Sequence, residues 1–186
     1  MSRRHPAAGL AITALALTGC TNTPAPVPPS PNAVMSSWIP TPEQTIAENA
    51  LQVYRQYWQL REQAEASPGS QDWRESFAHL MADPALTTVV DELAALASIP
   101  AHSVGQYRRA PKVQSVSTVE PARVVIVDCL DASAEHLVSD RPGQAGKSLG
   151  APGQSGRYRL EAEVVRYPAP YRWLVRSVRS RLDEAC

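Results

Sequence analysis

The sequence predicts an α+β domain in which N-terminal helices pack on an antiparallel sheet. Apolar residues at helical spacing are confined to residues 41–100, and alternating or β-branched segments follow them. A proline-rich turn at 167–170 joins the last two expected strands and favours a hairpin. Helices followed by strands in this order are typical of the α+β class. With 44% hydrophobic residues in 186, the chain can form a core, expected over residues 41–186.

The first helix is expected to begin after Thr41. Thr41 is suited to the N-cap, Pro42 to the first helical position, and Gln44 completes a capping box. The helix should end at 67–69, which reads Ser-Pro-Gly. Its apolar stripe consists of Ile46, Ala50, Val53, Tyr54, Tyr57 and Trp58. The aromatic residues of this stripe favour core packing, with the lining of a ligand pocket as the alternative.

Two shorter helices are expected next. One covers 71–82, with an apolar stripe of Trp73, Phe77, Leu80 and Met81. The other follows Asp83 and Pro84 and should end before Pro100, because a residue that precedes proline is disfavoured in a helix.

The remaining segments are expected to be strands at 104–109, 112–119, 123–127, 158–164 and 171–178. Residues 123–127 are β-branched on both faces, as in a central strand. Glutamates alternate with apolar residues in 158–164, which predicts one solvated face. Residues 139–156 hold five of the nine glycines and are expected to form a mobile loop.

The first 19 residues are typical of an export signal. Arg3 and Arg4 precede an apolar stretch that is too short to span a membrane. The stretch ends in Leu17, Thr18, Gly19 and Cys20, which resemble a bacterial lipobox. That resemblance implies cleavage before Cys20 and acylation of its thiol, for example with palmitate, so that a lipid bilayer is the expected partner. The alternative is an ordinary secretory signal with a chance cysteine.

Residues 20–40 are predicted to be a lipidated cysteine and a tether. Proline occurs at 24, 26, 28, 29, 31 and 40, a composition that favours extended polyproline II. The folded domain is therefore expected outside the cytoplasm, at the outer face of the cytoplasmic membrane.

Cys129 and Cys186 are a possible disulfide pair. Disulfides persist in exported proteins, and an odd cysteine such as Cys20 then needs a role of its own. Such a bridge would stabilise the fold by about 4 kcal/mol in the chain-entropy description. The alternative is a buried free thiol at Cys129 and a loose C-terminal tail.

Composition and motifs argue against several functions. A net charge of zero and a pI near 6.9 argue against a nucleic-acid partner. Asp128, Asp131, Glu135 and His136 lie within nine residues, but their spacing matches no metal site and favours a turn, with Asp131 capping the residues after the strand. We therefore predict no catalytic residue, no metal and no cofactor. His79 and His102 are single histidines, and we expect each of them either at the surface or in the core with hydrogen-bond partners.

Arginines gather in the C-terminal strands, at 166, 172, 176, 179 and 181. They could form a basic face for an acidic partner. Alternatively, they pair with Glu161 and Glu163 on the neighbouring strand, each pair contributing under about 1 kcal/mol.

Several segments resemble the small lipoproteins of actinobacteria and their phages, which carry an NTF2-like (cystatin-like) domain. They are the lipobox LTGC, AENALQVYRQYWQLREQA, ARVVIVDCLD, GRYRLEAEVVRY and RWLVRSVRSRLDEAC, with 128–131 (DCLD) as the most specific mark. The resemblance implies a curved antiparallel sheet wrapped by N-terminal helices, a disulfide between Cys129 and Cys186, and no defined activity. Enzymes of this fold place an acid inside the cone, which makes Asp128 a candidate, with Tyr54 and Trp58 beside it in a possible pocket.

These observations favour a membrane-anchored, non-enzymatic module that binds an envelope protein or a small ligand. Two alternatives stay open. One is a cone-pocket enzyme of isomerase or hydrolase type, and the other is a phage-encoded lipoprotein that blocks superinfection.

Overall fold

The structure is a computed structural model that describes residues 39–150, 156–168, 170, 172–184 and 186. These residues belong to one compact unit, Ile39–Cys186. The predicted signal peptide, the lipobox Leu17, Thr18, Gly19 and Cys20, and the tether up to residue 38 lie outside the described residues. Within the described part, no helix combines the length and the apolar character that crossing a membrane requires.

The long first helix, α1 (Pro42–Ala66), begins as the sequence predicts. Thr41 Oγ1 accepts a hydrogen bond from Gln44 N at 3.2 Å, and Gln44 Oε1 accepts one from Thr41 N at 2.7 Å. The capping box is therefore confirmed, and the helix ends at the C-cap Ser67.

The second helix is shorter than its apolar stripe predicts. α2 covers Arg74–Ala78 only. The chain leaves the helix because it pairs with Val175. Ala82 N donates to the Val175 carbonyl and Val175 N donates to the Leu80 carbonyl, both at 2.9 Å, so that Met81 and Val175 form a β-bridge. Pairing with a strand replaces the last helical turn. The third helix, α3 (Ala85–Ala97), ends before Pro100 as expected.

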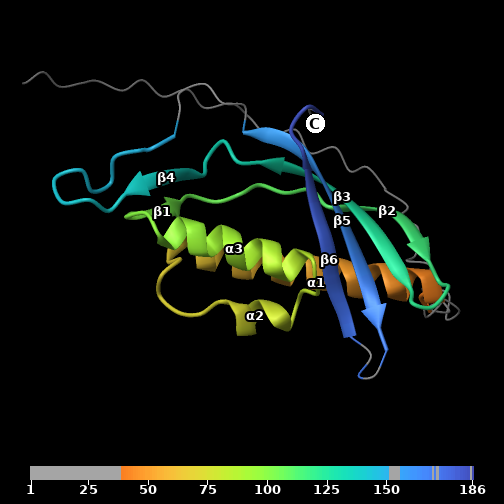
Figure 1. Ribbon diagram of the computed structural model, residues 1–186. Coiled ribbons are helices and arrows are strands. Elements are labelled where there is room, and N and C mark those ends of the chain that lie inside the picture. The colour runs from red at the N-terminus through yellow and green to blue at the C-terminus, as the bar shows by residue number, and fades with distance from the viewer. Residues whose placement is uncertain (1–38, 151–155, 169, 171, 185) are drawn as a thin grey trace, which may run out of the picture. The chain divides into compact units, whose positions relative to one another are not determined.

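A four-stranded antiparallel sheet packs against these helices, with the strand order β2-β3-β5-β6. Its strands are β2 (Lys112–Ser117), β3 (Arg123–Asp131), β5 (Arg157–Tyr167) and β6 (Arg172–Arg181). The predicted α+β class, with N-terminal helices on an antiparallel sheet, is confirmed (Figure 1). The central position of β3 and the hairpin of β5 and β6 also agree with prediction.

A second, two-stranded sheet was not expected. β1 (Ala101–Val104) pairs with β4 (His136–Ser139). The prediction of a strand at 104–109 is wrong, because β1 ends at Val104 and residues 105–111 run on without regular structure apart from a bridge at Arg108. The pairing of β1 with β4 joins residues about 35 positions apart, and no local sequence pattern predicts such a pairing.

Residues 140–149, predicted to lie in a mobile loop, are hydrogen-bonded back onto β4. Ser139 N donates to the Lys147 carbonyl at 2.9 Å, and Leu149 N donates to the Leu137 carbonyl at 2.8 Å. Gly143 and Gly146 adopt positive φ angles of 77° and 78°, which let the chain turn. This part of the predicted loop is thus an ordered turn, whereas 151–155 lie outside the described residues.

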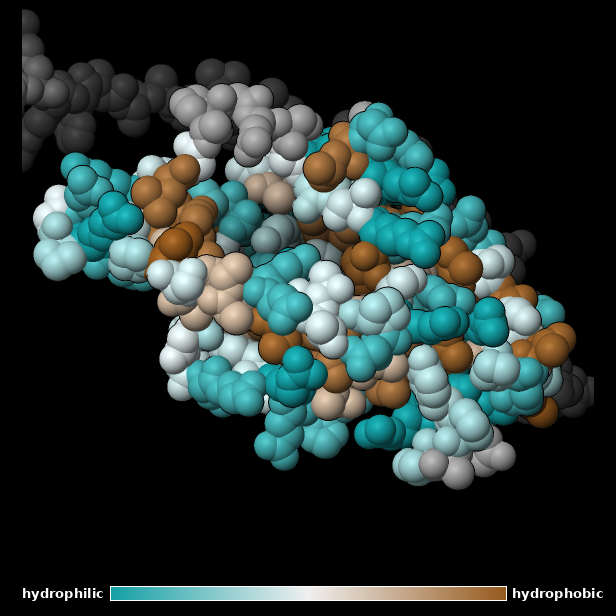
Figure 2. Space-filling view, in the orientation of Figure 1, coloured by the Kyte–Doolittle hydropathy of each residue, from teal (hydrophilic) through white to brown (hydrophobic). Residues whose placement is uncertain are grey.

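The core lies between α1 and one face of the sheet. Burial alternates along β3, so that Val124, Ile126 and Leu130 are buried towards the helices, whereas Val125 and Val127 are half-buried on the opposite face. We call that opposite face the uncovered face. Figure 2 shows hydrophilic residues over most of the visible surface, with hydrophobic residues in small separate groups, one of them near β4.

Candidate functional site

Asp128, the candidate acid of the sequence, is fully buried between the sheet and α1. The Tyr54 hydroxyl donates to its Oδ2 at 3.1 Å, and the Ala110 backbone N–H donates to its Oδ1 at 2.7 Å. Each carboxylate oxygen therefore has a partner. The residue connects three separate segments, namely β3, α1 and the segment before β2, which is the arrangement expected of a buried polar group that stabilises a fold.

Burial raises the pKa of Asp128 above its ordinary value, although the hydrogen bonds from Ala110 and Tyr54 and the nearby charge of Arg109 oppose the rise. Burial, followed by the Asp128 charge, likewise raises the pKa of Tyr54. A raised carboxyl pKa is common at active sites. Asp128, Tyr54 and Trp58, however, do not line any of four cavities of the described residues, which lie next to Arg61, His102, the disulfide and Pro42. The structure brings the three residues together in the core and does not place them around one of these cavities.

Residues 105–111, which we call the strap, cross α1 on the way to β2. The Tyr107 hydroxyl donates to Glu65 on α1 at 3.0 Å, and Arg108 exchanges two backbone hydrogen bonds with Asp131, at 2.8 and 2.9 Å. Arg109 then lies over the Trp58 ring, with its guanidinium carbon 5.2 Å from the ring centroid. The strap begins at Gly105, whose φ of 97° is unfavourable for other residues.

A network centred on Arg61 joins α1 to α3. Arg61 donates to Tyr57 at 3.1 Å, to Glu65 at 2.7 Å and to Glu92 at 2.8 Å. Burial alone would lower the pKa of Arg61, but the neighbouring Tyr57, Glu65 and Glu92 more than offset it and raise that pKa. Sequence analysis missed this network, although Tyr57, Arg61 and Glu65 follow one another at i, i+4 spacing, a signal of contact on a helix.

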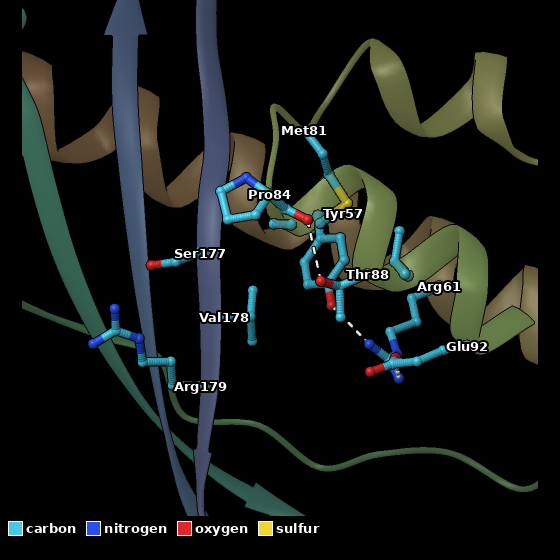
Figure 3. A pocket seen from close by; sticks show the side chains of 11 residues that line it. Tyr57, Arg61, Met81, Pro84, Thr88, Glu92, Ser177, Val178 and Arg179 are labelled. Atoms are coloured by element: carbon cyan, nitrogen blue, oxygen red, sulfur yellow. Dashed lines mark hydrogen bonds and ion pairs between the residues drawn. The ribbon is translucent and has the colours of Figure 1, made fainter.

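The Arg61 network borders a cavity of about 190 Å³ between α1, α3 and β6. Figure 3 shows Arg61 and Glu92 together at one side of it, while the Arg179 side chain leaves β6 away from the helices. All three guanidinium nitrogens of Arg61 are already bonded within the protein. A charged ligand would have to displace one of these bonds, so the cavity is better suited to water than to an anion.

His102 lies at the surface, one of the two positions that the sequence analysis expects, and it has a hydrogen-bond partner. Its Nδ1 lies 2.8 Å from Asp140 Oδ1, and both residues border a cavity of about 290 Å³ at the C-terminal ends of α1 and α3. The side chains are 34% and 48% exposed, so this is a hydrogen bond at the surface. It would contribute under about 1 kcal/mol to stability.

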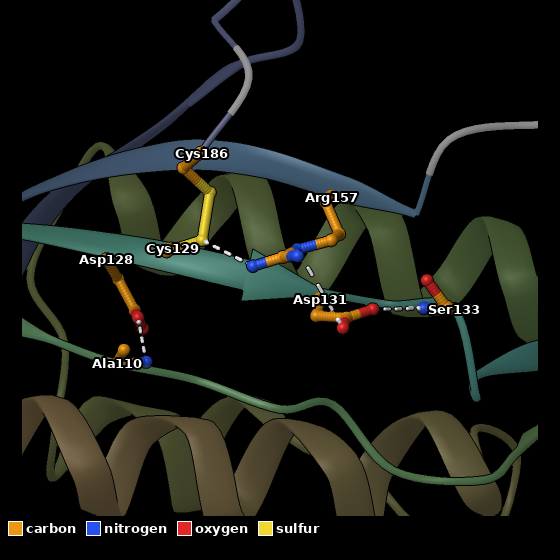
Figure 4. The surroundings of a disulfide bond; sticks show 7 residues. All are labelled: Ala110, Asp128, Cys129, Asp131, Ser133, Arg157 and Cys186. Carbon is orange, nitrogen blue, oxygen red and sulfur yellow. Dashed lines mark hydrogen bonds and ion pairs between the residues drawn. A yellow bond between two sulfur atoms is a disulfide. The ribbon is translucent and has the colours of Figure 1, made fainter.

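A disulfide bond joins Cys129 to Cys186, as predicted, with the two Cα atoms 5.7 Å apart. Figure 4 shows that Asp128 and Cys129, which are adjacent in β3, point to opposite faces of the strand. The disulfide therefore lies on the uncovered face. It borders a groove of about 420 Å³ that also contacts Lys112, Val127 and Arg159.

The acidic cluster after β3 forms a turn, as predicted. Asp131 Oδ1 accepts a hydrogen bond from Ser133 N at 3.0 Å, and Glu135 pairs with the Ser103 hydroxyl. The hydrogen bonds from Ser133, helped by Arg157, hold the pKa of Asp131 below its ordinary value. In the part of the chain that the structure describes, no group of three or more possible ligands could hold a metal.

Comparison with known proteins identifies no family. No family model matches the chain, and neither does any curated protein. The chain is similar to the crystal structure of the intermembrane space region of the chloroplast protein ARC6, with a TM-score of 0.53 at 14% identity over 75% of this chain and 97% of that chain. It also matches the solution NMR structure of a de novo β-sheet design protein, with a TM-score of 0.31 at 15% identity, covering 74% and 88% of the two chains. The likeness to the ARC6 region shows a shared α+β fold.

Proposed function

We propose that the chain is an exported lipoprotein, held at the outer face of the cytoplasmic membrane by an acylated Cys20, whose domain is a non-enzymatic interaction module. The observation that carries the proposal is the pairing of Cys129 with Cys186. This pairing accounts for two of the three cysteines and is typical of an oxidising compartment. It leaves Cys20, at the end of a lipobox-like sequence, as the remaining thiol.

The uncovered face is the proposed interaction surface. The helices fill the opposite face of the sheet, whereas this face presents the disulfide groove and the half-buried Val125 and Val127. Apolar residues on an open sheet face, ringed by charged ones, are typical of a docking surface. The N-terminal helices on an antiparallel sheet also support membership of the NTF2-like lipoproteins, which we retain as part of the proposal.

The surroundings of Asp128 support the proposed non-enzymatic role. The one fully buried carboxylate, among the residues described, has both oxygens bonded to the protein. A general base must lie within hydrogen-bond reach of its substrate, whereas Asp128 is fully buried and lines none of the four cavities described above. The arrangement around Asp128 therefore supports a structural role over a cone-pocket enzyme.

A photo-crosslinking experiment in the membrane of a bacterial host tests the proposed surface. A photoreactive residue at Lys112, which is exposed on the rim of the groove, is expected to give a crosslinked product. The matched control carries the same residue at Asp91, which is exposed on α3. The same products from both positions, or from neither, would argue against a surface confined to the uncovered face.

Fractionation of the same cells tests the anchor. The wild-type chain is expected in the membrane fraction, and a Cys20→Ala variant in the soluble fraction. A Cys20→Ala variant that stays with the membrane to the same extent would contradict acylation at that residue.

A further inference from the structure

Charge is divided between the two layers of the domain. Residues 41–97, which contain the three helices of the described part of the chain, have nine acidic and three basic residues, whereas residues 98–186 have nine acidic and thirteen basic ones. The helical layer is therefore acidic by six charges, and the part that forms the sheets is basic by four. The net charge of the whole chain hides this division.

The basic residues concentrate on β6, the edge strand of the four-stranded sheet. Arg172, Arg176, Arg179 and Arg181 are all exposed. One of these arginines has an acidic neighbour: Arg176 lies 3.8 Å from Glu163, which also lies 3.8 Å from Arg123. Among the described residues, Arg172, Arg179 and Arg181 have no ion-pair partner.

An apolar residue adjoins these arginines. Leu182 follows Arg181 directly and is 75% exposed. We define the basic surface as the four β6 arginines together with Leu182. Charged residues on an edge strand also discourage pairing with other chains, but either sign of charge would serve that purpose. Edge protection therefore does not explain why the acids gather on the helical layer.

We propose that the basic surface rests on a bilayer rich in anionic phospholipid, a proposal that deepens the proposed function and rests on it. Guanidinium groups form paired hydrogen bonds with phosphate, and exposed leucine is suited to the interface between headgroups and acyl chains. The acidic helical layer, repelled by the same lipids, would face away from the bilayer. One domain thus has a face that anionic lipid attracts and a face that it repels.

Because the lipid anchor already holds the domain near the membrane, a weak contact between the basic surface and the lipid is sufficient to orient the domain. Residues 21–38, 18 in number, separate Cys20 from the compact unit, and their contour length cannot exceed about 65 Å. A link of this length keeps the domain at a high effective concentration next to the membrane. A few arginines can then set its orientation, although they would bind a free domain only weakly.

Vesicle co-sedimentation of the chain from residue 21 to 186, which has no acyl group and retains the whole compact unit, tests the contact. Phosphatidylcholine vesicles with phosphatidylglycerol are expected to bind it at low salt, and pure phosphatidylcholine vesicles are not. An arginine near an anionic surface contributes about fivefold to binding. An Arg179→Gln/Arg181→Gln variant is therefore expected to bind about 25-fold more weakly.

Two matched variants separate charge position from net charge and from folding. Arg55→Gln/Arg74→Gln removes the same two charges from exposed positions on α1 and α2 and is expected to bind as the wild type does. Arg179→Lys/Arg181→Lys keeps the charges on β6 and is expected to restore binding. Thermal unfolding of each variant confirms that it is folded.

Three results would overturn the proposal. The first is equal binding to both kinds of vesicle, and the second is an equal loss of vesicle binding in the two glutamine variants. The third is a concentration-dependent dimer that the β6 substitutions abolish, because such a dimer would assign the basic surface to the acidic helices of a second copy. None of these results bears on acylation, which the mass of the Cys20 peptide measures separately.

Discussion

The Tyr54 hydroxyl on α1 donates a hydrogen bond to Asp128 on β3, 74 residues away in the sequence, and both side chains are fully buried. This bond connects the first helix to the central strand across the core. A buried carboxylate that loses a donor retains its full cost of desolvation. The pair therefore specifies how α1 lies on the sheet, in addition to any contribution to stability.

Removal of the Tyr54 hydroxyl is expected to weaken the fold. Tyr54→Phe leaves Asp128 Oδ2 without its donor and should lower the free energy of unfolding by about 1–3 kcal/mol. Urea unfolding measures the change. Tyr158→Phe is the control, because the Tyr158 hydroxyl forms no hydrogen bond with the residues that the structure describes. Equal losses in the two variants would contradict a specific role for the bond.

The raised pKa of Asp128 predicts a pH dependence of stability. A carboxyl with a higher pKa in the folded than in the unfolded chain holds its proton more tightly in the folded chain. Its contribution to stability is therefore complete at pH values below the unfolded pKa and is lost as the pH rises through the folded pKa. Asp128→Asn cannot titrate. The stability of the wild type relative to this variant should therefore fall as pH increases above the ordinary aspartate pKa of about 3.9.

Urea unfolding of the wild type and of Asp128→Asn at a series of pH values gives that difference directly, since the other titrating groups are common to both chains. A difference that stays constant, or that grows with pH, would show that the pKa of Asp128 is not raised in the folded protein.

The disulfide is expected to contribute strongly to stability. It joins residues 57 positions apart, and the chain-entropy description gives about 4 kcal/mol for such a loop. Cys186→Ser should lower the free energy of unfolding by roughly 2–4 kcal/mol, and reduction of the wild type should have the same effect. Cys20→Ser, which leaves the bond intact, serves as control. Unchanged thermal unfolding after reduction would rule out this contribution.

Gly105 is expected to tolerate no side chain. Its φ is 97°, and an added Cβ would overlap the carbonyl oxygen of Ala134. Gly143 has a similar φ of 77° but open space around it. Gly143→Ala should therefore cost about 1 kcal/mol from backbone strain alone, and Gly105→Ala clearly more. Thermal unfolding compares the two, and equal shifts would show that the start of the strap can move aside.

The elements that sequence analysis predicted correctly are those with local signals. The capping box at Thr41 marks the start of α1, and β-branched residues on both faces mark β3 as central. The disulfide could be predicted because cysteines are few. In each case the determining residues are close in sequence or belong to a very small set.

The features that were missed depend on contacts between distant residues. β1 and β4 are short strands that are stabilised by each other, and α2 ends early because Val175 pairs with the chain that follows it. The strap is irregular, and it is held by the Glu65 side chain of α1, by the Asp128 side chain of β3 and by the backbone of Asp131. Hydrophobic periodicity carries no information about such partners. The same limit explains why the sequence did not identify Asp140 as the partner of His102, since the two residues are 38 positions apart.

Peptide mass spectrometry of the protein extracted from bacterial membranes is the direct test of the lipid anchor at Cys20. We expect an N-terminal peptide that begins at Cys20 and carries the added mass of a diacylglycerol group on the thiol. An intact leader, or an unmodified thiol at Cys20, would contradict anchoring through this residue and with it the proposed place of the domain on the membrane.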